Sequence, residues 1–242
     1  LAAATTISNN LTITAGTLDT VSGSNYGLTI GNNYSNSGTF TARSGTVTFN
    51  ATDASNTLSG TMTGTSAFYD LTFNGVGGSW DLGAAATVTD DLIITNGTFS
   101  TSGTNYALTA GRIDVQTGGT LTANGSTITL TGTSGTLFTR TGTFTAGTST
   151  VVMNPDAAVT LTSGTVTFNN LTLSPTITVA RTYTLGSGAL TIDGDFNINP
   201  DAASALALTV NMGAAITVGG ITDTERCRSA VYEGQYVNRP SG

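Results

Sequence analysis

The segment Ser37–Asn50, SGTFTARSGTVTFN, decides how we expect the whole chain to fold. It holds two short runs, Thr39–Thr41 and Thr46–Phe49, in which apolar residues alternate with threonine, and Arg43-Ser44-Gly45 forms a turn-like link between them. Alternation with a period of two places apolar side chains on one face of a β-strand and hydroxyls on the other. The segment is therefore either a β-hairpin or two consecutive strands of stacked coils that a corner joins.

The same pattern recurs along most of the chain. Pairs of apolar residues at i and i+2 return at steps of roughly 16 to 24 residues, about 20 on average, which indicates a repeat architecture. The pairs are Leu11/Ile13, Leu28/Ile30, Val47/Phe49, Leu71/Phe73, Leu92/Ile94, Leu108/Ala110, Ile128/Leu130, Val151/Met153, Leu171/Leu173, Leu190/Ile192 and Leu208/Val210.

Stacked coils need the same inward position in every repeat, and these pairs supply it. The sequence thus predicts an all-β fold, a parallel β-solenoid (β-helix) of about eleven coils of roughly 20 residues. The alternative is a set of β-sandwich repeats, in which each repeat is a hairpin. A longer echo lies on top of the short repeat: LTITAGTL from Leu11 returns as LIITNGTF from Leu92, an offset of 81 residues that duplication would explain.

Composition restricts the possible functions. The net charge is −7, only 9% of the residues are charged, and lysine and histidine are absent. Nucleic acids and anionic membrane surfaces are bound through clustered lysine and arginine, so neither is an expected partner. No apolar run approaches the roughly 18 residues of a membrane-spanning helix, so membrane insertion is not expected. Without histidine or lysine there is no ordinary base to activate a serine or threonine nucleophile, and we expect no enzyme activity.

One segment is a weak candidate for a metal site. Asp193, Asp195 and Asn197 place oxygen side chains at every second residue, which suits a hard cation such as Ca²⁺. However, GNNY (Gly31–Tyr34) occupies the equivalent place in an earlier repeat and reads as an ordinary outward face. Asp90-Asp91 is a second acidic pair, expected at a coil corner. We therefore expect no cofactor. Calcium at Asp193–Asn197 is a weak candidate that remains to be compared with the structure.

The composition changes near the C-terminus. Residues 1–221 are predicted to form the solenoid repeat body and residues 222–242 a distinct tail, which serves as a cap, a linker or an assembly element. Stacked coils leave open strand edges at their ends, and head-to-tail joints that do not close produce filaments. The candidate assembly residues in the tail are Cys227, which is the only cysteine, Tyr232 and Tyr236.

Threonine pairs such as Thr120/Thr122 and Thr143/Thr145 suggest flat ranks of hydroxyls. Ice-binding solenoids resemble this pattern. Their ranks rest on coils of nearly constant length, whereas the steps here vary, so ice binding is the less favoured function.

Three segments carry a family resemblance: GTFTARSGTVTFN, FYDLTFNG (Phe68–Gly75) and DDLIITNGTFSTSGTNYALTAG (Asp90–Gly111). They resemble units of repetitive, β-strand-rich bacterial surface proteins of the adhesin type, with filamentous-haemagglutinin-style β-helix repeats. The resemblance covers roughly residues 6–220 and implies an extracellular or cell-surface location with a structural or adhesive role. The leading prediction is a secreted structural protein, the subunit of a filament or surface layer that self-associates through the solenoid ends and the tail. The alternative is an adhesive module of a larger surface protein, with surface glycans or a host or cell surface as partner.

Overall fold

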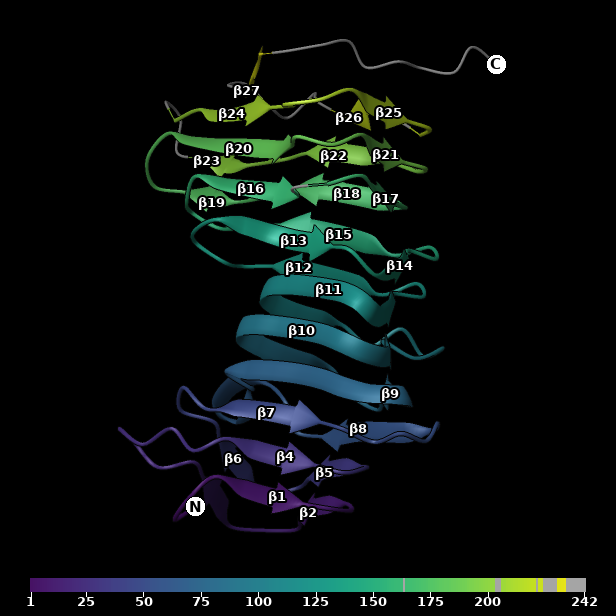
Figure 1. Cartoon of the computed structure of the whole chain (residues 1–242). Helices are drawn as coiled ribbons and strands as arrows, with labels where there is room; N and C mark the ends of the chain where they lie inside the picture. The colour runs from purple at the N-terminus through teal and green to yellow at the C-terminus, as the bar shows by residue number, and fades with distance from the viewer. Residues whose placement is uncertain (163, 203–205, 221, 224–229, 234–242) are drawn as a thin grey trace.

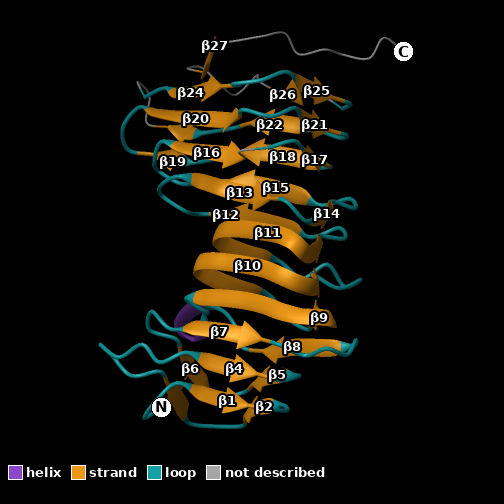
Figure 2. Cartoon of the chain, in the orientation of Figure 1, coloured by secondary structure: helices purple, strands orange, loops and turns teal. Residues whose placement is uncertain are grey.

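The computed structural model describes residues 1–162, 164–202, 206–220, 222–223 and 230–233. In this part the chain winds into a parallel β-solenoid of about ten turns (Figure 1). Figure 2 shows that strands and loops make up nearly all of it, with a single short 3₁₀ helix, η1 (Gly64–Ser66), among the described residues. β1 and β27 lie at opposite ends of the stack.

Each turn contributes to three ladders of parallel strands, which we call faces A, B and C. Face A consists of β1 (Thr5–Ile7), β4 (Leu28–Ile30), β7 (Thr46–Phe49), the beginning of β9 (Asp70–Leu82), the middle parts of β10 (Ala86–Ser100) and β11 (Leu108–Thr122), β13 (Thr136–Arg140), β16 (Val159–Thr162), β20 (Arg181–Gly186), β24 (Leu208–Asn211) and β27 (Ala230–Glu233).

Face B follows face A along the chain. It consists of β2 (Leu11–Ile13), β5 (Tyr34–Asn36), β8 (Asn56–Gly60), the ends of β9, β10 and β11, and β14 (Thr143–Thr145), followed by a separate ladder of β17 (Val166–Phe168), β21 (Leu190–Ile192) and β25 (Ile216–Val218).

Face C completes the turn. It consists of β3 (Thr17–Asp19), β6 (Thr39–Thr41), the beginnings of β10 and β11, β12 (Thr127–Leu130), β15 (Thr150–Met153), β18 (Asn170–Leu173), β22 (Phe196–Ile198) and β26 (Thr222–Asp223). A short additional pair, β19 (Thr176–Ile177) with β23 (Asp201–Ala202), lies between faces C and A. β26 and β27 show that the described part of the tail continues the ladders of the body.

The opening segment forms a corner of the solenoid. β6 pairs with β3 and β7 pairs with β4, each in parallel, so the two runs of Ser37–Asn50 belong to faces C and A. The hairpin interpretation is wrong, and with it the β-sandwich alternative. Arg43 turns the corner with a φ of 54°. The side chains of Phe40, Val47 and Phe49 are fully buried, whereas the alternating threonines are only partly covered.

Aromatic side chains form a continuous stack inside the first half of the rod. The ring of Phe73 lies parallel to those of Phe49 and Phe99, at centroid distances of 5.5 and 4.4 Å, and its centroid is 5.1 Å from that of Trp80. These residues come from three consecutive turns and are at most 1% exposed. Burial of such side chains contributes about 1.5–3 kcal/mol each, so the inward position of each turn supplies much of the stability.

The number of coils differs from the expectation. Face A holds eleven paired strands, which bound about ten turns, so the count differs only slightly from the eleven coils expected. The apolar pairs that were counted as one series lie on different faces: Leu11/Ile13 on face B, Leu28/Ile30 on face A and Ile128/Leu130 on face C. Paired residues on one face are between 19 positions apart, as for Leu28 and Val47, and 27 apart, as for Arg181 and Leu208. The true turn is therefore longer than the sequence step.

The 81-residue echo also changes face. Leu11 lies on face B but its counterpart Leu92 lies on face A. Thr39–Thr41 lies on face C but its counterpart Thr120–Thr122 lies on face B. The offset is thus not a whole number of turns, and each copy is displaced by one face around the axis.

Replacement of Phe73 by alanine should lower the free energy of unfolding by about 3–5 kcal/mol, because it leaves a cavity between two stacked rings. Urea unfolding followed by the fluorescence of Trp80, the single tryptophan, would report on this region directly. Val76→Ala, at a side chain that is 74% exposed, is the control and should change stability by less than about 0.5 kcal/mol. Equal effects of the two substitutions would contradict the assignment of Phe73 to the core.

Candidate functional site

The corner between faces C and A carries the charged side chains that pair with one another. Asp19 pairs with Arg43, Asp90 and Asp91 pair with Arg112, and Asp156 pairs with Arg181. Each ion pair joins one turn to the next. Within the described ranges of the chain, these are the salt bridges that form. The corner is therefore an electrostatic seam along the rod.

Three carboxylates meet in the middle of this seam. Oxygens of Asp70, Asp90 and Asp91 lie within 4.8 Å of one another, and all three residues are partly buried. Arg112 donates from Nε to Asp91 and from Nη2 to Asp90, each at 2.6 Å. Asp70 accepts hydrogen bonds from the backbone N–H of Asp91 (3.2 Å) and from the hydroxyl of Thr46 (3.4 Å). The cluster thus connects four consecutive turns.

The surroundings of Asp70 shift its pKa. Partial burial raises the pKa of Asp70, and the negative charges of Asp90 and Asp91 raise it further. The charge of Asp90 also raises the pKa of Tyr69. Arg112 already occupies the oxygens of two carboxylates with charge-assisted hydrogen bonds, so a cation would have to displace a guanidinium. The arrangement is suited to holding turns together rather than to binding a metal ion.

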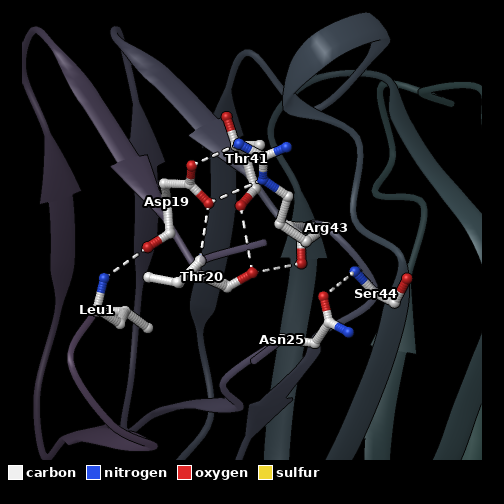
Figure 3. A network of polar contacts seen from close by, with 9 residues as sticks. Leu1, Asp19, Thr20, Asn25, Thr41, Arg43 and Ser44 are labelled. Carbon is white, nitrogen blue, oxygen red and sulfur yellow. Dashed lines mark hydrogen bonds and ion pairs between the residues drawn. The ribbon is translucent and has the colours of Figure 1, made fainter. Parts of the chain in front are cut away.

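Figure 3 shows the first ion pair of the seam and the polar contacts around it. Arg43 binds Asp19 through two hydrogen bonds, of 3.0 Å from Nε and 2.7 Å from Nη2. These bonds lower the pKa of Asp19 to about 2. The hydroxyl of Thr20 donates to the carbonyl of Ala42 at 2.6 Å, and the N-terminal amine of Leu1 donates to the carbonyl of Asp19 at 2.6 Å. These side chains and the N-terminal amine thereby add to the backbone bond from Thr20 to Thr41 at this corner.

A corner with the same sequence pattern recurs 81 residues later without charge, between faces B and C. Ser100 and Asn124 replace Asp19 and Arg43, and the amide of Asn124 donates to the Ser100 hydroxyl at 3.2 Å. Thr101, the counterpart of Thr20, donates to the carbonyl of Ala123 at 2.7 Å. The hydrogen-bonded corner is therefore retained between the two copies, whereas the ion pair is not required for it.

The calcium candidates do not share one strand. Asp193 follows β21 on face B and Asn197 lies in β22 on face C, because the chain turns a corner between them. Asp193 and Asp195 are exposed, and the backbone N–H of Asp195 donates to the side chain of Asn170 at 2.8 Å. The three carboxylates that do converge within the described ranges are those of Asp70, Asp90 and Asp91. Calcium binding at Asp193–Asn197 stays a prediction.

The candidate assembly residues lie at the margin of the described chain. Cys227 and Tyr236 fall outside the described residues. Tyr232 lies in β27, where it is the register partner of Val210 in β24. Its strand therefore extends face A by one rung, and the role of the three residues in assembly stays a prediction.

The threonine ranks form despite unequal turns. On face B two ranks of polar side chains run in register across four turns, Ser79–Thr98–Thr120–Thr143 and Asp81–Ser100–Thr122–Thr145. Unequal turns therefore do not by themselves break such ranks, because corners and bulges absorb the differences in length. Sequence steps could not reveal this, since they do not separate strand residues from corner residues.

Asp70→Asn should stabilise the protein at pH 7. Because folding raises the pKa of Asp70 above 3.8, the fold favours its protonated form, and this contribution is present below about pH 3.8 and lost as the pH rises through the folded pKa. Asparagine is neutral and keeps an oxygen for the N–H of Asp91. The thermal midpoint should rise at pH 7 and the gain should shrink at pH 3. Asp81→Asn, at an exposed position, controls for the change in net charge; an equal gain there would contradict the prediction.

The Asp19–Arg43 pair should make stability fall in acid. Folding lowers the pKa of Asp19 from 3.8 to about 2, so its contribution is present above pH 3.8 and lost as the pH falls toward 2. The double variant Asp19→Ser/Arg43→Asn copies the neutral pair Ser100–Asn124 and should lack this loss. The difference in thermal midpoint between the native chain and the variant should therefore narrow between pH 4 and pH 2. A constant difference across this range would show that the ion pair is not the cause.

Comparisons with known proteins identify no relative of this chain. No family model matches it, and no curated protein and no solved structure does so either. Within the described residues, no helix is long and apolar enough to cross a membrane. Function therefore has to be argued from the architecture and its surface.

Proposed function

We propose that the chain is a structural element of an extracellular filament or cell-surface layer, in which the ladders of one copy continue into the next. One observation carries this proposal. Among the described residues β1, β2 and β3, the first rung of faces A, B and C, pair with β4, β5 and β6, and the other edge of each strand has the geometry to pair with a further strand. A strand edge of this kind is a template for pairing with another chain.

The backbone of the first rung points half of its polar groups away from the rod. Thr5 donates to Gly27 and Ile7 accepts from Gly31, so these residues bond to the second turn. Leu11 donates to Asn33 and Ile13 accepts from Ser37 in the same way. By the alternation of a parallel ladder, the N–H and C=O groups of Thr6 and Thr12 face the open side.

The apolar core extends to this end. Ile7, Leu11 and Leu18 pack against the core but are only partly buried. A second copy that covered them would bury apolar surface, which stabilises association by about 25 cal/mol per Å². The joint would be heterologous, between opposite ends, and such joints give open filaments when they do not close into rings.

The lateral surface of the rod offers little for association, which favours assembly along the axis. On face A every strand from β4 to β24 is paired on both sides, and the arginines of the seam are paired with its aspartates. The lateral surface is mainly threonine, serine and asparagine, which remain hydrated without a partner. The extracellular location rests on the resemblance to repetitive bacterial surface proteins.

Negative-stain electron microscopy of the full chain tests the proposal. We expect unbranched fibres with an axial repeat of about 50 Å, from the eleven rungs of face A spaced about 4.8 Å apart. Separate short rods at every protein concentration would refute axial assembly.

Two matched variants test whether the contact between copies forms at the outward edges of β1 and β2. Thr6→Pro/Thr12→Pro removes outward N–H groups without touching the bonds to the second turn, and proline is tolerated on edge strands. Fibres should be lost in this variant. Thr6→Val/Thr12→Val keeps the N–H groups and should still assemble. If the proline variant forms fibres as readily as the valine variant, the joint lies elsewhere.

A further inference from the structure

A hollow of about 230 Å³ opens on face A across three consecutive turns. It lies over the beginnings of β13, β16 and β20. Its lining consists of Gly135, Ala158, Val159, Thr160, Thr182 and Thr184. The lining contains three hydroxyls, an apolar floor and no charged side chain.

A missing side chain creates the hollow. Thr136 is the register partner of Thr160, so Gly135 stands in the same rank as Val159 and, one turn further, Tyr183. Val159 and Tyr183 fill this inward position, with 5% and 0% exposure. Gly135 has no side chain and is exposed, and a Cβ built there would meet no atom within 4 Å, so the space beside it is open. The surface therefore sinks toward Val159 at this point of the rod.

The hydroxyls around the hollow are available to a ligand. Those of Thr160, Thr182 and Thr184 make no hydrogen bond to any described residue, whereas other threonines of the rod use theirs, as Thr139 does with Asp114 at 2.6 Å. A hydroxyl both donates and accepts, so the three can match either kind of group. The nearest ion pair in sequence, Arg181 with Asp156, is satisfied internally at 2.6 Å.

We propose that this hollow binds one ring of a neutral carbohydrate. Its volume equals that of about seven or eight water molecules and is below the roughly 300–1,000 Å³ of sites for drug-sized ligands. A pyranose ring combines hydroxyls with an apolar C–H face, which matches threonine hydroxyls beside the side chains of Val159 and Ala158. An uncharged lining would leave the carboxylate of an acidic sugar without a partner and so selects neutral sugars.

The proposal does not depend on filament formation. A single rod would bind one ring weakly, and an assembly would present the hollow once per copy. Linked weak sites bind a polymeric glycan with much greater avidity than one site alone.

Saturation-transfer NMR on the full chain, with the methyl glycosides of glucose, galactose, mannose and N-acetylglucosamine as probes, tests the site. At least one glycoside should receive saturation. Thr184→Val should weaken its binding about threefold to tenfold, as expected for one lost hydrogen bond. Thr48→Val is the matched control, because Thr48 also points outward on face A, lies outside the hollow and makes no side-chain hydrogen bond among the described residues.

Ala158→Phe is the second variant. Ala158 is exposed, so the larger side chain should fill the hollow and abolish binding while leaving the circular dichroism spectrum unchanged. Absence of saturation for all four glycosides would overturn the proposal. Binding that survives Ala158→Phe, or that Thr48→Val weakens as much as Thr184→Val does, would overturn it as well.

Discussion

Parallel backbone pairing between successive turns is the interaction on which the rest of the structure depends. It fixes the distance between rungs, and therefore every side chain at a given register position lies above its counterpart one turn away. Close approach is part of this geometry: a Cβ at Gly60 would collide with the backbone of Asn36, and one at Gly75 with the backbone of Ala51. Inward positions then build a core that extends from turn to turn, and outward positions build ranks.

The sequence predicted the solenoid because apolar pairs at i and i+2 mark an inward face wherever they occur. It could not predict which face each pair occupies, since Leu11 and Leu92 lie in nearly identical sequences on different faces. The seam was visible only as the adjacent pair Asp90-Asp91. Asp70 lies one turn before Asp90-Asp91 and Arg112 one turn after it. The number of residues in each turn depends on irregular corners, so the sequence did not show that these four side chains meet. The hollow at Gly135 was missed, since nothing in the sequence distinguishes this glycine from those at other corners.

Charge in this protein acts locally. Asp19 and Arg43 hold one corner with an ion pair, and Ser100 and Asn124 hold the equivalent corner with a neutral hydrogen bond. Exposed ion pairs contribute only about 0–1 kcal/mol, so either solution is sufficient where backbone pairing and the core supply most of the stability. This explains how a chain with 9% charged residues can build a long ordered surface. Hydroxyl and amide groups take over the polar contacts that charges make elsewhere.

The displacement of the 81-residue echo by one face has a geometric consequence for longer rods of this kind. If a chain grew by repeating this unit, each new copy would present the same sequence in a direction one third of a revolution away from the previous copy. Three copies would face all three directions. A feature encoded once in the unit would then follow a wide spiral around the rod, so that a rod projecting from a surface could meet neighbours on any side without twisting its own strands.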